Sequence, residues 1–260
     1  MPSVRSCALM RAAFAVTALV FSGCGGSKAP LRVLPPEPRD STSSALGVTL
    51  SLAGGSEVAS PPTIVVFARF DDPARDAEAL QRATLVESNF VDGNHYYLLN
   101  AAPGAYAVVG ARSTSKYKGA AANEQRPRAT DSLETSLSFS FGTEHTRHDE
   151  IWFAREVIAA TLVDVPAGAF TFAGEVEVAV TKALGVGDAA QSVLLARRQS
   201  TAALSVSGST VHREGWFGGL AGVHKDADAA ARFRDATHPA LGSAEWSARL
   251  RAGHDPGAPH

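Results

Sequence analysis

Apolar and polar residues alternate with a period of two along several stretches of the chain. In the first stretch Leu46, Val48 and Leu50 lie on one side, and Gly47 and Thr49 lie on the other. This period is typical of a β-strand with one buried and one wet face. Similar patterns, one of them apolar on both faces, predict further strands at 63–70, 95–99, 105–111, 133–141 and 170–180.

Turn residues separate these stretches. Asp92-Gly93-Asn94, Pro103-Gly104 and Pro166-Ala167-Gly168 are hairpin or corner signals, because glycine accepts positive φ and proline fixes φ. Short strands separated by such turns, with few long helical periods between them, favour an all-β body over βαβ units. We therefore expect a mainly β protein, an antiparallel β-sandwich spanning residues 45–224.

Two segments carry a helical pattern. Residues 73–83 suit a short helix or a decorated loop, with Asp72 as a possible N-cap. Residues 225–252 predict a pair of C-terminal helices, capped at Asp226 or Asp228 and broken at Pro239 and Gly242. We expect their large apolar side chains to pack on the sheet, and residues 253–260 to form a disordered tail. These side chains are Phe233, Leu241, Trp246 and Leu250.

The N-terminus has the layout of an export signal. Arg5 and Arg11 supply early positive charge, and an apolar run over residues 12–21 ends at small residues. The run is shorter than the ~20 residues that a membrane-spanning helix needs. Phe21-Ser22-Gly23-Cys24 then resembles the bacterial lipobox, although Leu is usual where Phe21 stands. The resemblance implies a signal peptide over residues 1–23, a lipid on Cys24 and a mature protein anchored to a membrane of the cell envelope. The alternative is an ordinary secretory signal with an incidental cysteine.

Cysteine count, spacer and charge extend this interpretation. Cys7 lies within the signal, so the mature chain keeps Cys24 alone and forms no internal disulfide. No Asp follows Cys24 to resemble an inner-membrane retention signal, so we expect the outer membrane. Residues 24–44 are rich in Gly, Ser and Pro and predict a flexible tether. Loss of the two signal arginines takes Lys and Arg from 24 to 22 against 26 acidic residues, which gives no electrostatic footprint for nucleic acid.

One stretch resembles a known β-sandwich family. Residues 89–111 look like the second half of a carboxypeptidase-regulatory-like, or transthyretin-like, domain, in which a Pro-Gly turn precedes an aromatic that opens the next strand. Pro103, Gly104 and Tyr106 match this pattern, and residues 163–172 carry a weaker echo. The family's usual opening, a Gly-x-Val strand and a Gly-rich turn, is missing. The resemblance implies an accessory or binding module without catalytic residues.

The most suggestive chemical cluster is His145, His148, Asp149 and Glu150. Two imidazoles beside two carboxylates could hold a metal, yet catalytic zinc needs three protein ligands, and no third ligand is identifiable. The surrounding residues indicate a solvated loop between strands at 142–150. A metal-dependent hydrolase using these residues is the alternative to a non-enzymatic protein.

Aromatic pairs and one basic segment are the remaining candidates. Trp152 and Trp216, each followed by phenylalanine, could form an exposed platform for sugar or peptide, or could pack in the core. Residues 112–128 hold five basic residues and predict a solvated loop. No Gly-x-Ser-x-Gly elbow and no phosphate-binding loop are present.

These observations favour a lipid-anchored envelope protein without enzymatic activity or cofactor. Its partners would be the membrane, through Cys24, and an envelope protein or glycan. Binding would depend on whether segments 112–128, 142–150 and 215–222 meet at one end of the body, since loops on a rigid scaffold usually carry binding sites.

Overall fold

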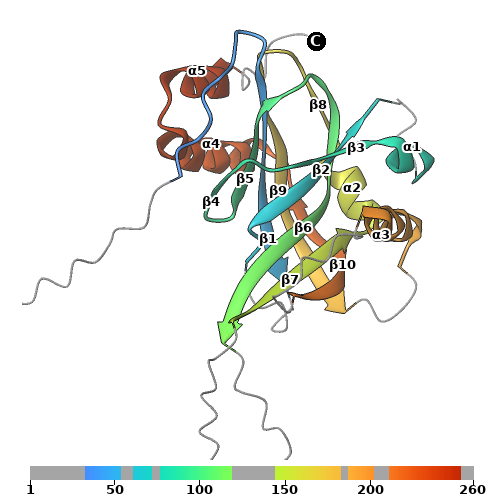
Figure 1. The fold of residues 1–260 in the computed structure, drawn as a ribbon. Coiled ribbons are helices and arrows are strands. Elements are labelled where there is room, and N and C mark those ends of the chain that lie inside the picture. Colours follow the sequence, from blue (N-terminus) through green and yellow to red (C-terminus); the bar gives the residue numbers. More distant parts are fainter. Residues whose placement is uncertain are drawn as a thin grey trace, which may run out of the picture. The chain divides into compact units, whose positions relative to one another are not determined.

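A computed structural model places most of the body of the chain. It describes residues 33–53, 61–71, 77–118, 144–182, 187–201 and 211–252. Ten strands and five helices lie in these ranges (Figure 1). The mainly β character expected from the sequence is confirmed.

The strands account for more of the described residues than the helices. They are β1 (Ser44–Ala53), β2 (Ile64–Phe70), β3 (Thr84–Glu87), β4 (Phe90–Asp92), β5 (His95–Ala101), β6 (Gly104–Lys118), β7 (Glu144–Phe153), β8 (Val163–Val165), β9 (Phe170–Lys182) and β10 (Val211–His224). The helices are α1 (Ala77–Arg82), α2 (Arg155–Thr161), α3 (Ala189–Thr201), α4 (Ala227–Leu241) and α5 (Ala244–Ala252). The expected strand at 133–141 lies outside the described residues, as do the signal and the tail.

All ten described strands belong to one sheet. Its order is β3-β2-β6-β7-β10-β9-β1-β5-β4, and β8 pairs with β6. The sheet is mixed, because β1 pairs with β9 in parallel and β7 pairs with β10 in parallel. The expectation of a purely antiparallel arrangement is therefore wrong. Alternation assigns each residue to a face of its strand, but it does not select the neighbouring strand or its direction.

The sheet curls until its two ends meet. The terminal strands β3 and β4 are consecutive in the chain, joined by Ser88 and Asn89. The Ser88 amide donates to Val65 O on β2 at 2.8 Å, and the Asn89 amide donates to Tyr97 O on β5 at 2.9 Å. One core of apolar side chains from β1, β2, β5, β6, β7, β9 and β10 fills the inside of the curl. The expected two-sheet sandwich is not confirmed, because hydrogen bonding joins all described strands into a single sheet.

Helices cover two parts of the outer face. α1 and α3 bury Leu80 and Leu194 against β2, β6 and β7, with Ile158 of α2 beside them. α4 and α5 cover β1, β5 and β9, on the other side of the curl (Figure 1). Within the described ranges, no helix has the length and apolar character needed to cross a bilayer.

The C-terminal helices follow the capping signals of the sequence. Asp226 is the N-cap of α4 and accepts the Ala229 amide at 2.8 Å, while Gly242 ends the helix with φ 63°. Pro239 lies inside the last turn instead of breaking the helix. It removes one late hydrogen bond, and burial of the residues after it offsets this loss. The four side chains expected to pack on the sheet, Phe233, Leu241, Trp246 and Leu250, are all buried there.

The described half of the expected tether is part of the folded body. Pro36 O accepts a hydrogen bond from Trp246 Nε1 at 2.8 Å, and Glu37 Oε2 accepts one from Ser243 Oγ at 2.8 Å. Arg249 donates to Asp40 O at 2.7 Å. A flexible tether over the whole of 24–44 is therefore wrong for residues 36–43, and residues 24–32 lie outside the described part.

Candidate functional site

The described parts of segments 112–128, 142–150 and 215–222 lie side by side as strands. β6 and β7 are antiparallel neighbours with Arg112 opposite Glu150, and β10 runs parallel to β7 with Gly215 opposite Glu150. The loop interpretation of residues 144–150 is wrong, and so is that of residues 112–118, whereas residues 215–222 lie in a strand whose register shifts between Leu220 and Gly222. The polar side chains suggested a solvated loop, but such residues also occur in strands, where they pair with side chains on the neighbouring strand. Thr114 Oγ1 on β6, for example, lies 3.0 Å from His148 Nδ1 on β7.

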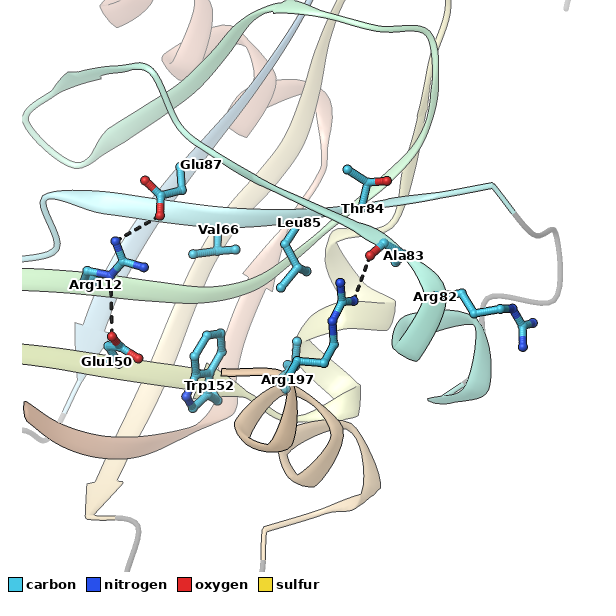
Figure 2. A pocket seen from close by; sticks show the side chains of 11 residues that line it. Val66, Arg82, Ala83, Thr84, Leu85, Glu87, Arg112, Glu150, Trp152 and Arg197 are labelled. Carbon is cyan, nitrogen blue, oxygen red and sulfur yellow. Dashed lines mark hydrogen bonds and ion pairs between the residues drawn. The ribbon is translucent and has the colours of Figure 1, made fainter. Parts of the chain in front are cut away.

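A groove of about 470 Å³ opens on the outer face of this region (Figure 2). It crosses β3, β2, β6 and β7 and is bounded by α3 and by the end of α1. Its lining residues are Val66, Arg82, Ala83, Thr84, Leu85, Glu87, Arg112, Glu150, Trp152, Leu194 and Arg197. The volume falls within the usual range for small-ligand sites.

Apolar side chains form the floor of the groove. Val66, Leu85 and Trp152 come from three strands, and the six-membered ring of Trp152 points toward the other two (Figure 2). Gly110 makes room for this ring, because a Cβ at that position would lie 3.0 Å from Trp152 Cε3. The indole is 6% exposed, and its N–H has no hydrogen-bond partner within the described residues.

Two arginines and two carboxylates surround this floor. Arg112 on β6 lies between Glu87 on β3, at 2.9 Å, and Glu150 on β7, at 3.8 Å. Arg197 on α3 donates from Nη1 to Leu80 O and Ala83 O, each at 2.8 Å, and so joins α3 to the C-terminal end of α1. The groove therefore offers charges of both signs next to an apolar surface.

The expected aromatic platform of Trp152 and Trp216 is not formed. The register of β7 and β10 sets Trp152 opposite Phe217, and Trp216 opposite Ile151. Trp152 consequently faces outward into the groove, whereas Trp216 is 2% exposed and packs inside the curl. An exposed platform is wrong for both residues, and only Trp152 reaches the groove.

The proposed metal cluster is divided between the two faces of the sheet. Asp149 points inward, and its Oδ1 accepts Arg147 Nε at 2.8 Å and Trp216 Nε1 at 3.1 Å. Glu150, the next residue, points outward to Arg112. His148 contacts Thr114, and the side chain of His145 lies outside the described part. Among the side chains that the structure describes, no three His, Cys, Asp or Glu residues come together.

Sequence reasoning identified part of the groove. It singled out Trp152, Glu150 and the basic segment that begins at Arg112, but it missed Leu85 and Glu87. These two residues alternate with polar or inward-facing neighbours on a strand of four residues, which is too short to give a period. The sequence patterns also did not predict α3, and therefore did not identify Arg197 as a groove residue.

Comparison with known proteins gives no template for this arrangement. No known protein family, curated protein or solved structure matches the chain. The groove is therefore interpreted from its own residues.

Proposed function

We propose that this chain is a lipid-anchored protein of the bacterial envelope that binds another envelope protein without catalysing a reaction. The lipobox-like Phe21-Ser22-Gly23-Cys24 supports the anchor, which places a diacylglyceryl group on the Cys24 sulfur. The outer membrane is the proposed location, since no Asp follows Cys24. The turn at Pro103 and Gly104, followed by the buried Tyr106, supports a relationship to carboxypeptidase-regulatory-like binding modules.

The groove is the observation that carries the binding function. Its floor can receive one apolar side chain, and Arg112 with Glu87 and Glu150 can meet polar groups on either side of it. A peptide segment supplies this combination, because its backbone and side chains offer donors and acceptors around an apolar anchor.

A glycan fits the groove less well. Sugar rings pack on exposed aromatic faces, whereas Trp152 is 6% exposed and its ring contributes to the core of the outer face. The protein partner is therefore preferred to the glycan.

Site-specific photo-crosslinking in cells tests the groove. A photoreactive residue at Leu85 should give a discrete protein adduct, and Arg112→Glu should abolish it by setting three carboxylates together. A photoreactive residue at Arg232 on α4, whose side chain forms an exposed ion pair with Glu175 on β9, is the matched control and should give no such adduct. Equal crosslinking from both positions would remove the groove from the proposal.

The anchor and the absence of catalysis have their own tests. Mass spectrometry should find a diacylated N-terminal Cys24, and Cys24→Ala should release the protein from membranes. An unmodified product that starts elsewhere contradicts the anchor. Turnover of peptidoglycan, lipid or ester by the purified protein contradicts a non-enzymatic role, and stoichiometric zinc or iron in untagged protein would favour the hydrolase alternative.

A further inference from the structure

Residues 36–43, which precede β1, form a segment fastened along the C-terminal helices; we call it the N-terminal clasp. Trp246 Nε1 on α5 donates to Pro36 O at 2.8 Å, and Ser243 Oγ, just before α5, donates to Glu37 Oε2 at 2.8 Å. Further along, Arg249 on α5 donates to the carbonyl oxygens of Asp40 and Ser43. The guanidinium of Arg249 also lies over the Trp246 ring, 5.1 Å from its centroid.

Asn100, at the end of β5, holds the middle of the clasp from its other side. Its Nδ2 donates to Glu37 O at 2.9 Å, and its Oδ1 accepts the Arg39 amide at 3.0 Å. Asn100 has φ 60°, a conformation that costs energy in a residue other than glycine. The paired hydrogen bonds to the clasp stabilise this residue in its unusual conformation.

Two large apolar side chains lie immediately before the clasp. Val33 is 74% exposed and Leu34 is 78% exposed, although each is followed by residues that are held to the body. Large exposed aliphatic side chains next to one another suit an apolar environment outside the protein. α5, to which Pro36 is bonded through Trp246, presents Arg251 and the exposed Ala248 to solvent.

The clasp shortens the free part of the chain after the proposed lipid. From Cys24 to Ser44 a tether of 20 residues could reach ~66–72 Å when extended, but from Cys24 to Pro36 only 12 residues remain, with a reach of about 40–43 Å. A flexible coil of this length has a root-mean-square end-to-end distance of roughly 17–21 Å. Pro36 and the part of α5 that is bonded to it therefore lie within this reach of the attached lipid.

We propose that the N-terminal clasp sets the orientation of the body, so that Val33, Leu34 and the exposed side of α5 face the bilayer. This inference rests on the proposed lipid at Cys24. The partner of this surface is the lipid headgroup region, in which the two aliphatic side chains are buried and Arg251 meets phosphate. The groove lies beside α1 and α3, on the other side of the curl, and faces away from the membrane.

The experiment measures the distance of two labelled positions from a membrane. After lipidation the Cys24 sulfur is a thioether and Cys7 has left with the signal, so an engineered cysteine is the one free thiol. Ala248→Cys on α5 and Gln81→Cys on α1 are both exposed and each takes a fluorophore. The lipidated chain is reconstituted in phosphatidylethanolamine and phosphatidylglycerol vesicles that contain a headgroup-labelled quencher lipid.

The label at 248 should be quenched several-fold more than the label at 81. Asn100→Gly keeps the backbone conformation but removes both hydrogen bonds to the clasp. Combined with Arg249→Ala, it should make quenching equal at positions 248 and 81. Val33→Ser with Leu34→Ser should reduce quenching at 248 while the clasp stays closed.

The outcomes separate the two proposals. Equal quenching at both positions in a chain whose mass shows the diacylated Cys24 overturns the orientation alone. A preference for 248 that survives the clasp variants overturns the role of the clasp. A chain without the diacylglyceryl mass overturns the anchor, and the orientation with it.

Discussion

Gly47 and Phe233 provide the sharpest test of how the C-terminal helices dock on the sheet. Gly47 lies on β1, and a Cβ added there would overlap the Phe233 Cζ and lie 3.1 Å from both Cε atoms. The Phe233 ring has little space to retreat. It is 2% exposed, stacks on Phe172 with centroids 4.5 Å apart, and lies 5.7 Å from Tyr97. The absence of a side chain at Gly47 therefore allows α4 to approach β1.

The two substitutions should be strongly coupled. Gly47→Ala overpacks this site and should cost about 1–3 kcal/mol. Phe233→Ala empties it and should cost about 3–5 kcal/mol. In the double variant the new methyl group enters the vacated space, so the total should stay near that of Phe233→Ala, about 1–3 kcal/mol below the sum of the two single effects.

Urea unfolding of the non-lipidated Cys24→Ser chain, followed by circular dichroism, measures these free energies. Gly219→Ala on β10 is the matched control, because a Cβ there meets nothing within 4 Å, and it should change stability by less than about 0.5 kcal/mol. Additive single effects, or a control as costly as Gly47→Ala, would refute the argument from close approach.

Substitutions at three further positions test other contacts. Burial raises the pKa of Tyr97 to about 12, so stability should be full below pH 10 and fall by roughly 2–3 kcal/mol between pH 10 and 12; alkaline unfolding of Tyr97→Phe should show a shallower fall. Asp149→Ala removes the acceptor of the Trp216 indole and should cost about 3–5 kcal/mol in urea unfolding, with a smaller loss in Asp149→Asn. Hydrogen bonding to the Ala229 amide lowers the pKa of Asp226, so the cap should weaken as pH falls through that lowered value. Asp226→Ala should lower the melting temperature at pH 7, while Asp226→Asn should keep most of it.

Local patterns predicted those elements that are stabilised by local chemistry. The alternation at 46–52 and 170–180 became β1 and β9, since each strand has one face inside the curl. Asp226 and Gly242 marked the ends of α4 because capping involves neighbouring residues in the chain.

The prediction failed where a partner far away in the chain decides the structure. Asp149 and Glu150 on β7 are both buried, because Asp149 accepts the Trp216 indole inside the curl and Glu150 pairs with Arg112 outside it. Nothing near them in the sequence identifies these partners. The parallel pairing of β7 with β10 depends on long connections in the same way.

The groove is harder to predict than any strand that lines it. Its floor brings together Val66, Leu85 and Trp152, and its far wall is Arg197, more than a hundred positions beyond Val66. Each of these residues has an ordinary role within its own element. The three floor residues share the outer face of neighbouring strands, and α3 brings Arg197 over that face, only once the sheet order is fixed.

The clasp shows why proline content alone misjudged the tether. Prolines keep the start of this segment extended and without helix or strand hydrogen bonds, and a turn follows in which Asp40 Oδ1 accepts the Thr42 amide at 2.8 Å. The same property leaves its carbonyl oxygens available, and the body supplies donors for them: Trp246 for Pro36, Asn100 for Glu37 and Arg249 for the later residues. A segment already restricted to an extended form loses less conformational freedom when it docks. The proline-rich composition that predicted a flexible tether therefore also favours docking of the clasp. The donors on α5 and β5 determine which residues of the segment are bound to the body.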